Sequence, residues 1–190
     1  TVHLTQIDVN EDGTFAYMTV LGDNDSSGSY SISVMARGAK QPFVTNAYYL
    51  SHMETEKIEN GINAAASAKE TETLIRTEAE ILGISNFTDL KVSVAAEMLY
   101  HAASVKTLTF SEIQAIARKS EALFAQLQTA SANGLGSLLA GEHNVLLGKC
   151  DAYGQYQRMK SKDRDAVNEA AAAKKPFASV ADFKEKFEQA

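Results

Sequence analysis

The first 50 residues show the alternation of apolar and polar positions that is typical of β-strands. Residues 29–34 alternate strictly between serine and an apolar side chain, as expected of a strand with one solvated face. Residues 4–9 and 14–21 are rich in β-forming residues and flank the turn sequence Asn10–Gly13, and residues 43–50 have a similar composition. The pattern predicts three or four antiparallel strands in a meander, with an apolar face that needs a cover.

From Ser51 onward, apolar residues recur every three or four positions, which predicts helices. Residues 53–82 carry a thin apolar stripe, and residues 88–104 place four apolar side chains on one face: Leu90, Val94, Met98 and Ala102. The clearest pattern follows Ser111, a predicted N-cap, and has the spacing of a packed helical seam. The seam residues are Ile113, Ile116, Ser120, Leu123, Leu127 and Ala130.

The last third of the chain predicts further helices. Residues 131–134 read as the end of the seam helix, and residues 137–175 read as one long helix or a broken pair. Four apolar residues there repeat every seven positions, although glycines interrupt the repeat: Val145, Ala152, Met159 and Ala166. Pro176 stops this helix, and Ser179 with Asp182 three residues later caps a last helix over residues 180–189.

Together these patterns predict an α+β fold. We expect a small N-terminal antiparallel β-meander, residues 1–50, followed by a mostly helical bundle, residues 51–190. A chain of 190 residues with 45% hydrophobic and 22% charged residues can bury a core of ordinary size. The single cysteine, Cys150, excludes an internal disulfide.

Composition and charge narrow the functional classes. The chain has no run of 18 apolar residues, so we expect no membrane contact, and its start at Thr1 lacks the features of a signal peptide. Synthesis in the cytoplasm is therefore expected. Residues 1–100 hold 14 acidic and six basic residues, whereas residues 101–190 hold ten and 12, so the acidic half disfavours broad wrapping of nucleic acid.

Two turn sequences resemble calcium loops in their spacing. Asp8–Gly13 reads D-x-N-x-D-G and Asp23–Gly28 reads D-x-D-x-S-G, which places oxygen ligands at alternate positions. The twelfth position of such a loop should be a bidentate glutamate, but it is Thr19 in one and Val34 in the other. Ordinary hairpin turns and a cation site both remain open, with hairpin turns favoured.

The catalytic patterns fail on spacing. Gly141 to Lys149 departs from the register of a phosphate-binding loop. Glu97 and His101 stand one helical turn apart without the further carboxylates of a di-metal site. Cys150 and His143 are about two turns apart, too far for a nucleophile and its base. We therefore predict that the protein is not an enzyme and holds no cofactor or structural metal.

One basic segment offers an alternative function. It contains Tyr153 and Tyr156 among five cations, and cations with aromatic side chains suit phosphate contacts and base stacking. The cations are Lys149, Arg158, Lys160, Lys162 and Arg164. This segment predicts a small nucleic-acid-binding protein as the second hypothesis, although neighbouring aspartates dilute the charge.

The leading hypothesis is a non-enzymatic structural protein that works by packing against other proteins. The helical seam, an unprotected β edge and the absence of a catalytic motif support it. The expected partners are further copies of the chain or other subunits of a large assembly, such as a virus particle.

Overall fold

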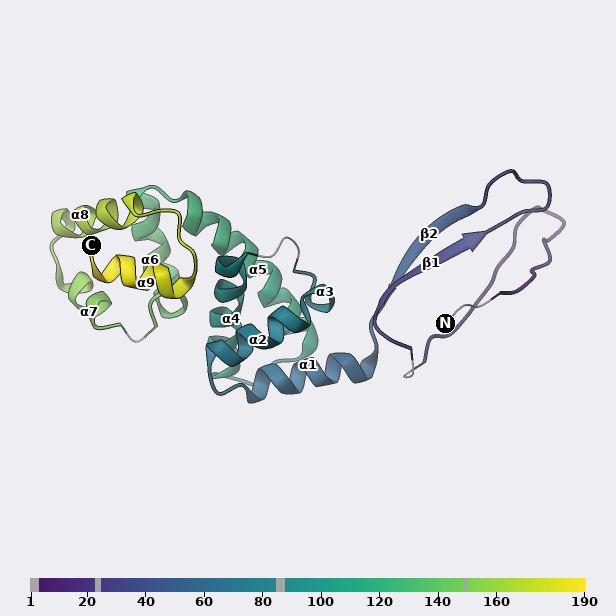
Figure 1. Cartoon of the computed structure of the whole chain (residues 1–190), viewed down its shortest axis with the longest axis horizontal. Helices are drawn as coiled ribbons and strands as arrows, with labels where there is room; N and C mark the ends of the chain where they lie inside the picture. The colour runs from purple at the N-terminus through teal and green to yellow at the C-terminus, as the bar shows by residue number, and fades with distance from the viewer. Residues whose placement is uncertain (1–3, 23–24, 85–87, 149) are drawn as a thin grey trace. The chain divides into compact units, whose positions relative to one another are not determined.

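A computed structural model describes residues 4–22, 25–84, 88–148 and 150–190, and Figure 1 shows its elements. Within these ranges the chain forms a two-stranded antiparallel sheet followed by nine helices, which confirms the predicted α+β class with its helical bundle. The chain divides into two compact units, Thr1–Glu56 and Lys57–Ala190. We call the first the arm and the second the helical unit.

The sheet of the arm consists of β1 (Gly28–Val34) and β2 (Phe43–Tyr49). The register runs from Gly28 opposite Tyr49 to Val34 opposite Phe43. The prediction of further strands over residues 4–9 and 14–21 was wrong, because neither segment pairs with a strand in the described structure. A strand exists only where a second backbone lies alongside it, and local β propensity does not supply one.

Helix α1 (His52–Ala64) begins in the arm and continues into the helical unit. It is followed by α2 (Ala68–Thr77) and α3 (Ala79–Leu82), so the apolar stripe predicted over residues 53–82 belongs to three helices. The Ser67 hydroxyl accepts a hydrogen bond from the Glu70 amide and thereby starts α2. Gly83, with φ of 73°, ends α3 in the left-handed conformation that favours glycine.

Helices α4 (Asp89–Ala103) and α5 (Phe110–Thr129) form the centre of the helical unit. The predicted N-cap of α5 at Ser111 was wrong, because Thr109 caps the helix. Thr109 and Glu112 form a reciprocal capping box, in which the Glu112 carboxylate accepts from the Thr109 amide at 2.9 Å. The seam itself is confirmed, since Ile113, Leu123 and Leu127 are buried.

The region from residue 131 forms four helices: α6 (Ala132–Leu146), α7 (Asp151–Arg158), α8 (Ser161–Ala173) and α9 (Val180–Glu188). Ser131 starts α6 as its N-cap and does not end α5, and the single or paired helix predicted over residues 137–175 is three helices. The seven-residue repeat was misleading, because Met159 and Ala166 are exposed. The predicted cap of α9 is confirmed, since the Ser179 hydroxyl accepts from the Asp182 amide.

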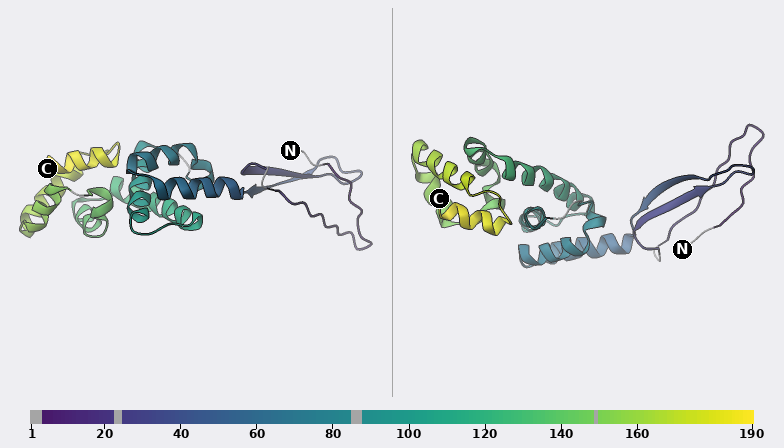
Figure 2. Two further views of the ribbon diagram at one scale, coloured as in Figure 1. Left: turned by 90° about the horizontal axis from the view of Figure 1, so that it is seen from below. Right: turned by 45° about the horizontal axis from the view of Figure 1, so that its top comes forward.

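Helix α4 packs into two apolar clusters. Leu90, Val94 and Met98 belong to a cluster with α6–α9, and Val92 and Leu99 belong to a cluster with α1–α3. Figure 2 shows the green and yellow helices α6–α9 on one side of α4 and the blue helices α1 and α2 on the other. Helix α5 spans both clusters, so the helical unit has a continuous apolar interior of its own.

Candidate functional site

The two faces of the sheet in the arm differ sharply in polarity. Residues that oppose one another across an antiparallel pair lie on the same face. One face, called here the apolar sheet face, is formed by Tyr30, Ile32, Val34, Phe43, Ala47 and Tyr49, together with Gly28 and Thr45. The opposite face carries Ser29, Ser31, Ser33 and Asn46 beside Val44 and Tyr48.

The apolar sheet face is largely uncovered. Phe43 is 69% exposed and Ile32 is 47% exposed, while Tyr30, Val34 and Tyr49 are half-buried. Among the described residues of the arm, only Ser51 is buried. The arm therefore has an amphipathic sheet but no apolar core beneath it.

Polar contacts hold the base of the hairpin. The Glu54 carboxylate in α1 accepts from the Ser27 amide at 2.6 Å, and the Ser27 hydroxyl accepts from the Ser51 amide at 2.7 Å. The Tyr49 hydroxyl donates to the Gly22 carbonyl at 3.1 Å. These contacts fix the ends of the strands to the start of α1 but bury no apolar surface.

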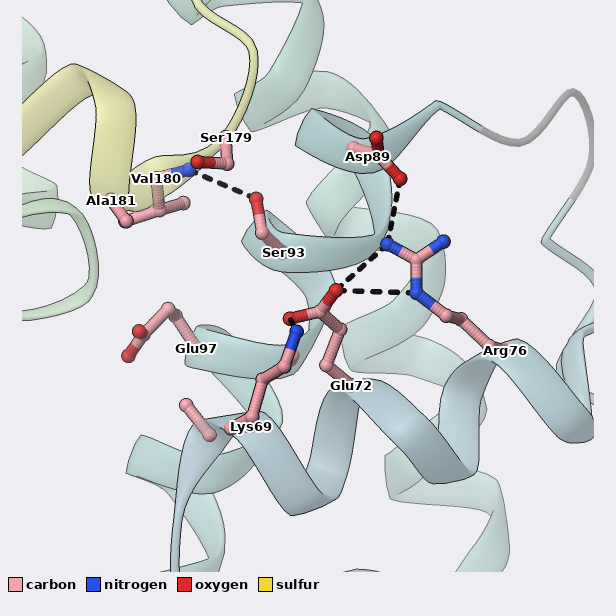
Figure 3. Close-up of a pocket in the computed structure, with 11 residues that line it drawn as sticks. Lys69, Glu72, Arg76, Asp89, Ser93, Glu97, Ser179, Val180 and Ala181 are labelled. Carbon is pink, nitrogen blue, oxygen red and sulfur yellow. Dashed lines mark hydrogen bonds and ion pairs between the residues drawn. The ribbon is translucent and has the colours of Figure 1, made fainter.

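A cleft of about 480 Å³ lies in the helical unit, between α2, α4 and the start of α9 (Figure 3). One wall is an ion-pair ladder, in which Glu72 bonds to Lys69 at 3.0 Å and to Arg76 at 2.7 Å. Arg76 also bonds to Asp89 at 2.8 Å. The ladder ties α2 to the first turn of α4, so its charges already have partners within the protein.

Glu97 extends into this cleft from α4 (Figure 3). Burial raises the pKa of its carboxyl group and outweighs the nearby positive charge of Lys184, while the Glu72 carboxylate raises the pKa further. No hydrogen bond or ion pair joins Glu97 to His101, although the structure describes both residues and His101 is exposed. The sequence pairing of Glu97 with His101 is therefore not a proton relay.

Replacing Glu97 with glutamine is expected to stabilise the helical unit at neutral pH. The folded-state pKa lies above the unfolded value, so the folded protein loses stability as the pH rises through that interval. Glutamine removes this cost, and the gain should disappear below pH 4, where the carboxyl group is protonated in both states. Thermal unfolding at pH 4 and pH 7.5 measures the difference, with Glu80→Gln at an exposed position of α3 as control. An equal gain at both pH values would contradict the assignment.

Of the two sequences that resemble calcium loops, the structure describes all of the first but only part of the second. At Asp8–Gly13 the chain turns with Gly13 at φ of 84°, and the Asp12 carboxylate accepts from the Thr14 hydroxyl at 2.6 Å. That hydrogen bond lowers the pKa of Asp12. At Asp23–Gly28, Asp23 and Asn24 lie outside the described residues. No group of three or more acidic, histidine or cysteine side chains that could hold a metal ion occurs in the described part of the chain.

The predicted basic segment keeps its cations at the surface. Lys149 lies outside the described residues, Arg158 is exposed at the end of α7, and Lys160 is exposed and immediately precedes α8. Lys162 is exposed and Arg164 half-buried in the first turn of α8. The structure thus places four of the five cations around the α7–α8 turn.

The tyrosines of that segment are buried, whereas its described cations lie at or near the surface. Tyr153 and Tyr156 are buried, the Tyr153 hydroxyl donates to the Leu139 carbonyl, and the Tyr156 hydroxyl donates to Asn168. His143 stacks on Tyr153 with ring centroids 4.5 Å apart. The expectation of exposed aromatics for base stacking was wrong, and only the cationic part of the nucleic-acid hypothesis stays a prediction.

Cys150 and His143 also have separate neighbours. The Cys150 thiol donates to the Glu188 carboxylate at 3.1 Å, whereas the His143 ring contacts Tyr153 and the Leu139 carbonyl. The structure does not bring this pair together as a nucleophile and a base.

Comparison with known proteins gives no match to a family model, a curated protein or a solved structure. Within the described residues, no helix combines the length and apolar character that crossing a membrane requires.

Proposed function

We propose that this is a non-enzymatic structural protein that assembles with other protein subunits through its arm. The observation that supports the proposal is the uncovered apolar sheet face, joined to a helical unit that has its own core. The partners proposed are further copies of the chain or subunits of a larger complex, such as a virus particle.

The hairpin of the arm needs a cover to be stable. A two-stranded hairpin without a cover is marginally stable in water, since it buries too little apolar surface to offset the cost of ordering the chain. The arm places Phe43, Ile32 and their neighbours at a water-exposed surface. Contact with a partner would remove that surface from water and supply the missing stabilisation.

The distribution of charge supports the same surface. Residues 1–56 contain seven acidic and two basic residues, but none of them lies within β1 or β2. Charged residues are depleted at the centre of protein interfaces, because each must be desolvated on binding. The sheet is thus free of the side chains that would oppose docking.

The surface of the helical unit exposes fewer large apolar side chains than the arm does. Among its described residues, the exposed large hydrophobic side chains are Val105 and Met159. A surface with few scattered apolar residues is normal for a protein in water. Apolar docking is therefore proposed for the arm and not for the helices.

The test compares substitutions on the two faces of the sheet. Ile32→Thr with Phe43→Thr removes apolar surface and leaves a β-branched residue of high strand propensity at each position. Ser31→Thr with Ser33→Thr is the matched control on the opposite face. The first pair should weaken assembly at least tenfold, because each lost apolar anchor costs about 1–2 kcal/mol. Native mass and sedimentation velocity measure the effect.

Two results would count against the proposal. If the wild-type chain stays monomeric both when pure and when mixed with extract of its source, the proposed assembly function is wrong. Equal assembly of the two paired variants would show that the apolar sheet face is not the contact.

A further inference from the structure

Residues 14–20 form a strand-like segment that lacks a strand partner. They run Thr-Phe-Ala-Tyr-Met-Thr-Val, with no charge, proline or glycine, which is the composition of a β-strand. All seven residues are exposed, with Met18 at 86% and Val20 at 81%. Among the described residues, no backbone hydrogen bond joins residues 15–21 to another part of the chain.

The sheet of the same unit has no third strand among the described residues. It contains only β1 and β2, so neither of them has a second strand beside it there. Natural proteins protect sheet edges with charged residues or proline, and neither strand contains one. The arm therefore carries both an open edge and a segment able to extend it.

We propose that residues 14–20 of one copy add as a strand to the open sheet edge of a second copy. The inference rests on the proposed assembly function and names the partner as the chain itself. Its basis is that a single chain contains the donor segment and the acceptor edge, so two copies can satisfy each other reciprocally. Exchange of an identical element is a common route to symmetric oligomers.

The anchoring of Gly22 explains why the segment is available to a neighbour. Its carbonyl accepts from the Tyr49 hydroxyl, and its amide donates to the Asp25 carboxylate at 2.9 Å. The chain is thus held at the end of β2 just after the donor segment, while residues 15–20 of that segment pair with no described strand. The alternative partner surface, the helical unit of a second copy, offers only Val105 and Met159 as exposed large apolar residues among its described positions.

Strand addition would also continue the faces of the sheet. Phe15, Tyr17 and Thr19 fall on one side of an added strand, and Ala16, Met18 and Val20 fall on the other. Whichever of these two sides continues the apolar sheet face, it adds aromatic or apolar residues to that face. Strand addition therefore predicts an alternating pattern of contacts, because only every second donor residue can lie on the same face as a given acceptor residue.

The experiment uses disulfide formation between two separately prepared full-length chains. In a Cys150→Ser background, which removes the only natural thiol, one chain carries a single donor cysteine at one of positions 15–20. The other chain carries Ser31→Cys in β1 or Asn46→Cys in β2, which lie opposite each other in the sheet. Side chains opposed across paired strands have Cβ atoms about 4.5–5.5 Å apart, close to the spacing of a disulfide.

The expected result is a cross-linked heterodimer whose yield alternates along the donor positions, high at every second residue. Cross-links to Ser31→Cys identify the edge of β1, and cross-links to Asn46→Cys identify the edge of β2; either pattern supports strand addition. Val105→Cys in the helical unit is the control acceptor, at which yields should be low and should not alternate.

Failure of this inference can be told apart from failure of the proposed function. If the chain assembles but the heterodimer is absent or its yield does not alternate, strand exchange is overturned and assembly through the apolar sheet face stands. If a single chain with Tyr17→Cys and Ser31→Cys forms an internal disulfide and the mixed chains do not cross-link, the segment pairs within its own chain and the inference is again overturned. A chain that stays monomeric at every concentration, alone or mixed with extract, overturns both proposals.

Discussion

Replacing Leu127 with alanine is expected to lower the free energy of unfolding of the helical unit by about 2–5 kcal/mol. Leu127 lies in α5 with no exposed surface, inside the cluster that joins α4 and α5 to α6–α9. The change removes apolar contacts and leaves a cavity that the surrounding helices can fill only in part. Urea denaturation followed by circular dichroism at 222 nm measures the loss.

Val105→Ala is the matched control for this measurement. Val105 is 75% exposed beyond the end of α4, so its truncation should change the free energy of unfolding by about 0.5 kcal/mol or less. A loss below about 1 kcal/mol for Leu127→Ala would show that the seam of α5 is not packed as described.

Deleting residues 1–50 is expected to abolish assembly while the helical unit stays folded. The deletion removes β1, β2 and the apolar sheet face. Among the described residues, however, no residue before Ser51 is buried. Loss of residues 1–50 therefore costs the helical unit none of its own core. The truncated chain should be a monomer by sedimentation velocity and retain a cooperative thermal unfolding transition.

The informative contrast is with Leu127→Ala in the full-length chain. That variant should unfold more readily while retaining the apolar sheet face, whereas the truncated chain should be stable but unable to assemble. A truncated chain that assembles to the same extent as the full-length chain would show that the helices make the connection.

The α+β class and the main apolar faces could be predicted from the sequence, because they depend on local periodicity. Strict alternation over residues 29–34 gave β1, and the four-residue spacing of Leu90, Val94 and Met98 gave one buried face of α4. Residues 14–21 have the same local signals as a strand but no strand partner among the described residues. Pairing depends on the rest of the fold, so composition alone could not decide it.

Helix ends were predicted less well, because neighbouring residues compete to cap them. Ser111 and Thr109 are both suitable N-caps, and Glu112 decides between them by standing three residues after Thr109. That spacing was readable in the sequence. The glycines near α6–α8 were harder, since Gly148 ends a helix at φ of 58° whereas Gly154 lies inside α7.

The candidate sites show a similar division. The amphipathic character of the sheet follows from the serines of β1, but the exposed fraction of its apolar side chains could not be read from that alternation. Tyr153 and Tyr156 stand three residues apart, a spacing that places them on one face of α7 and was a readable signal of burial. Their contacts with Leu139 and Asn168 could not be foreseen, because those partners lie on α6 and α8.

Helix α4 has a consequence for how the helical unit opens. Its residues enter both apolar clusters, so neither cluster can separate from α4 without exposing apolar side chains on that helix. Amide hydrogens in the middle of α4, near Ala95 and Leu99, are thus shielded from both sides and can exchange with solvent only when the whole unit unfolds. The slowest-exchanging amides of the protein should therefore report its global stability, and they should do so from a single central helix.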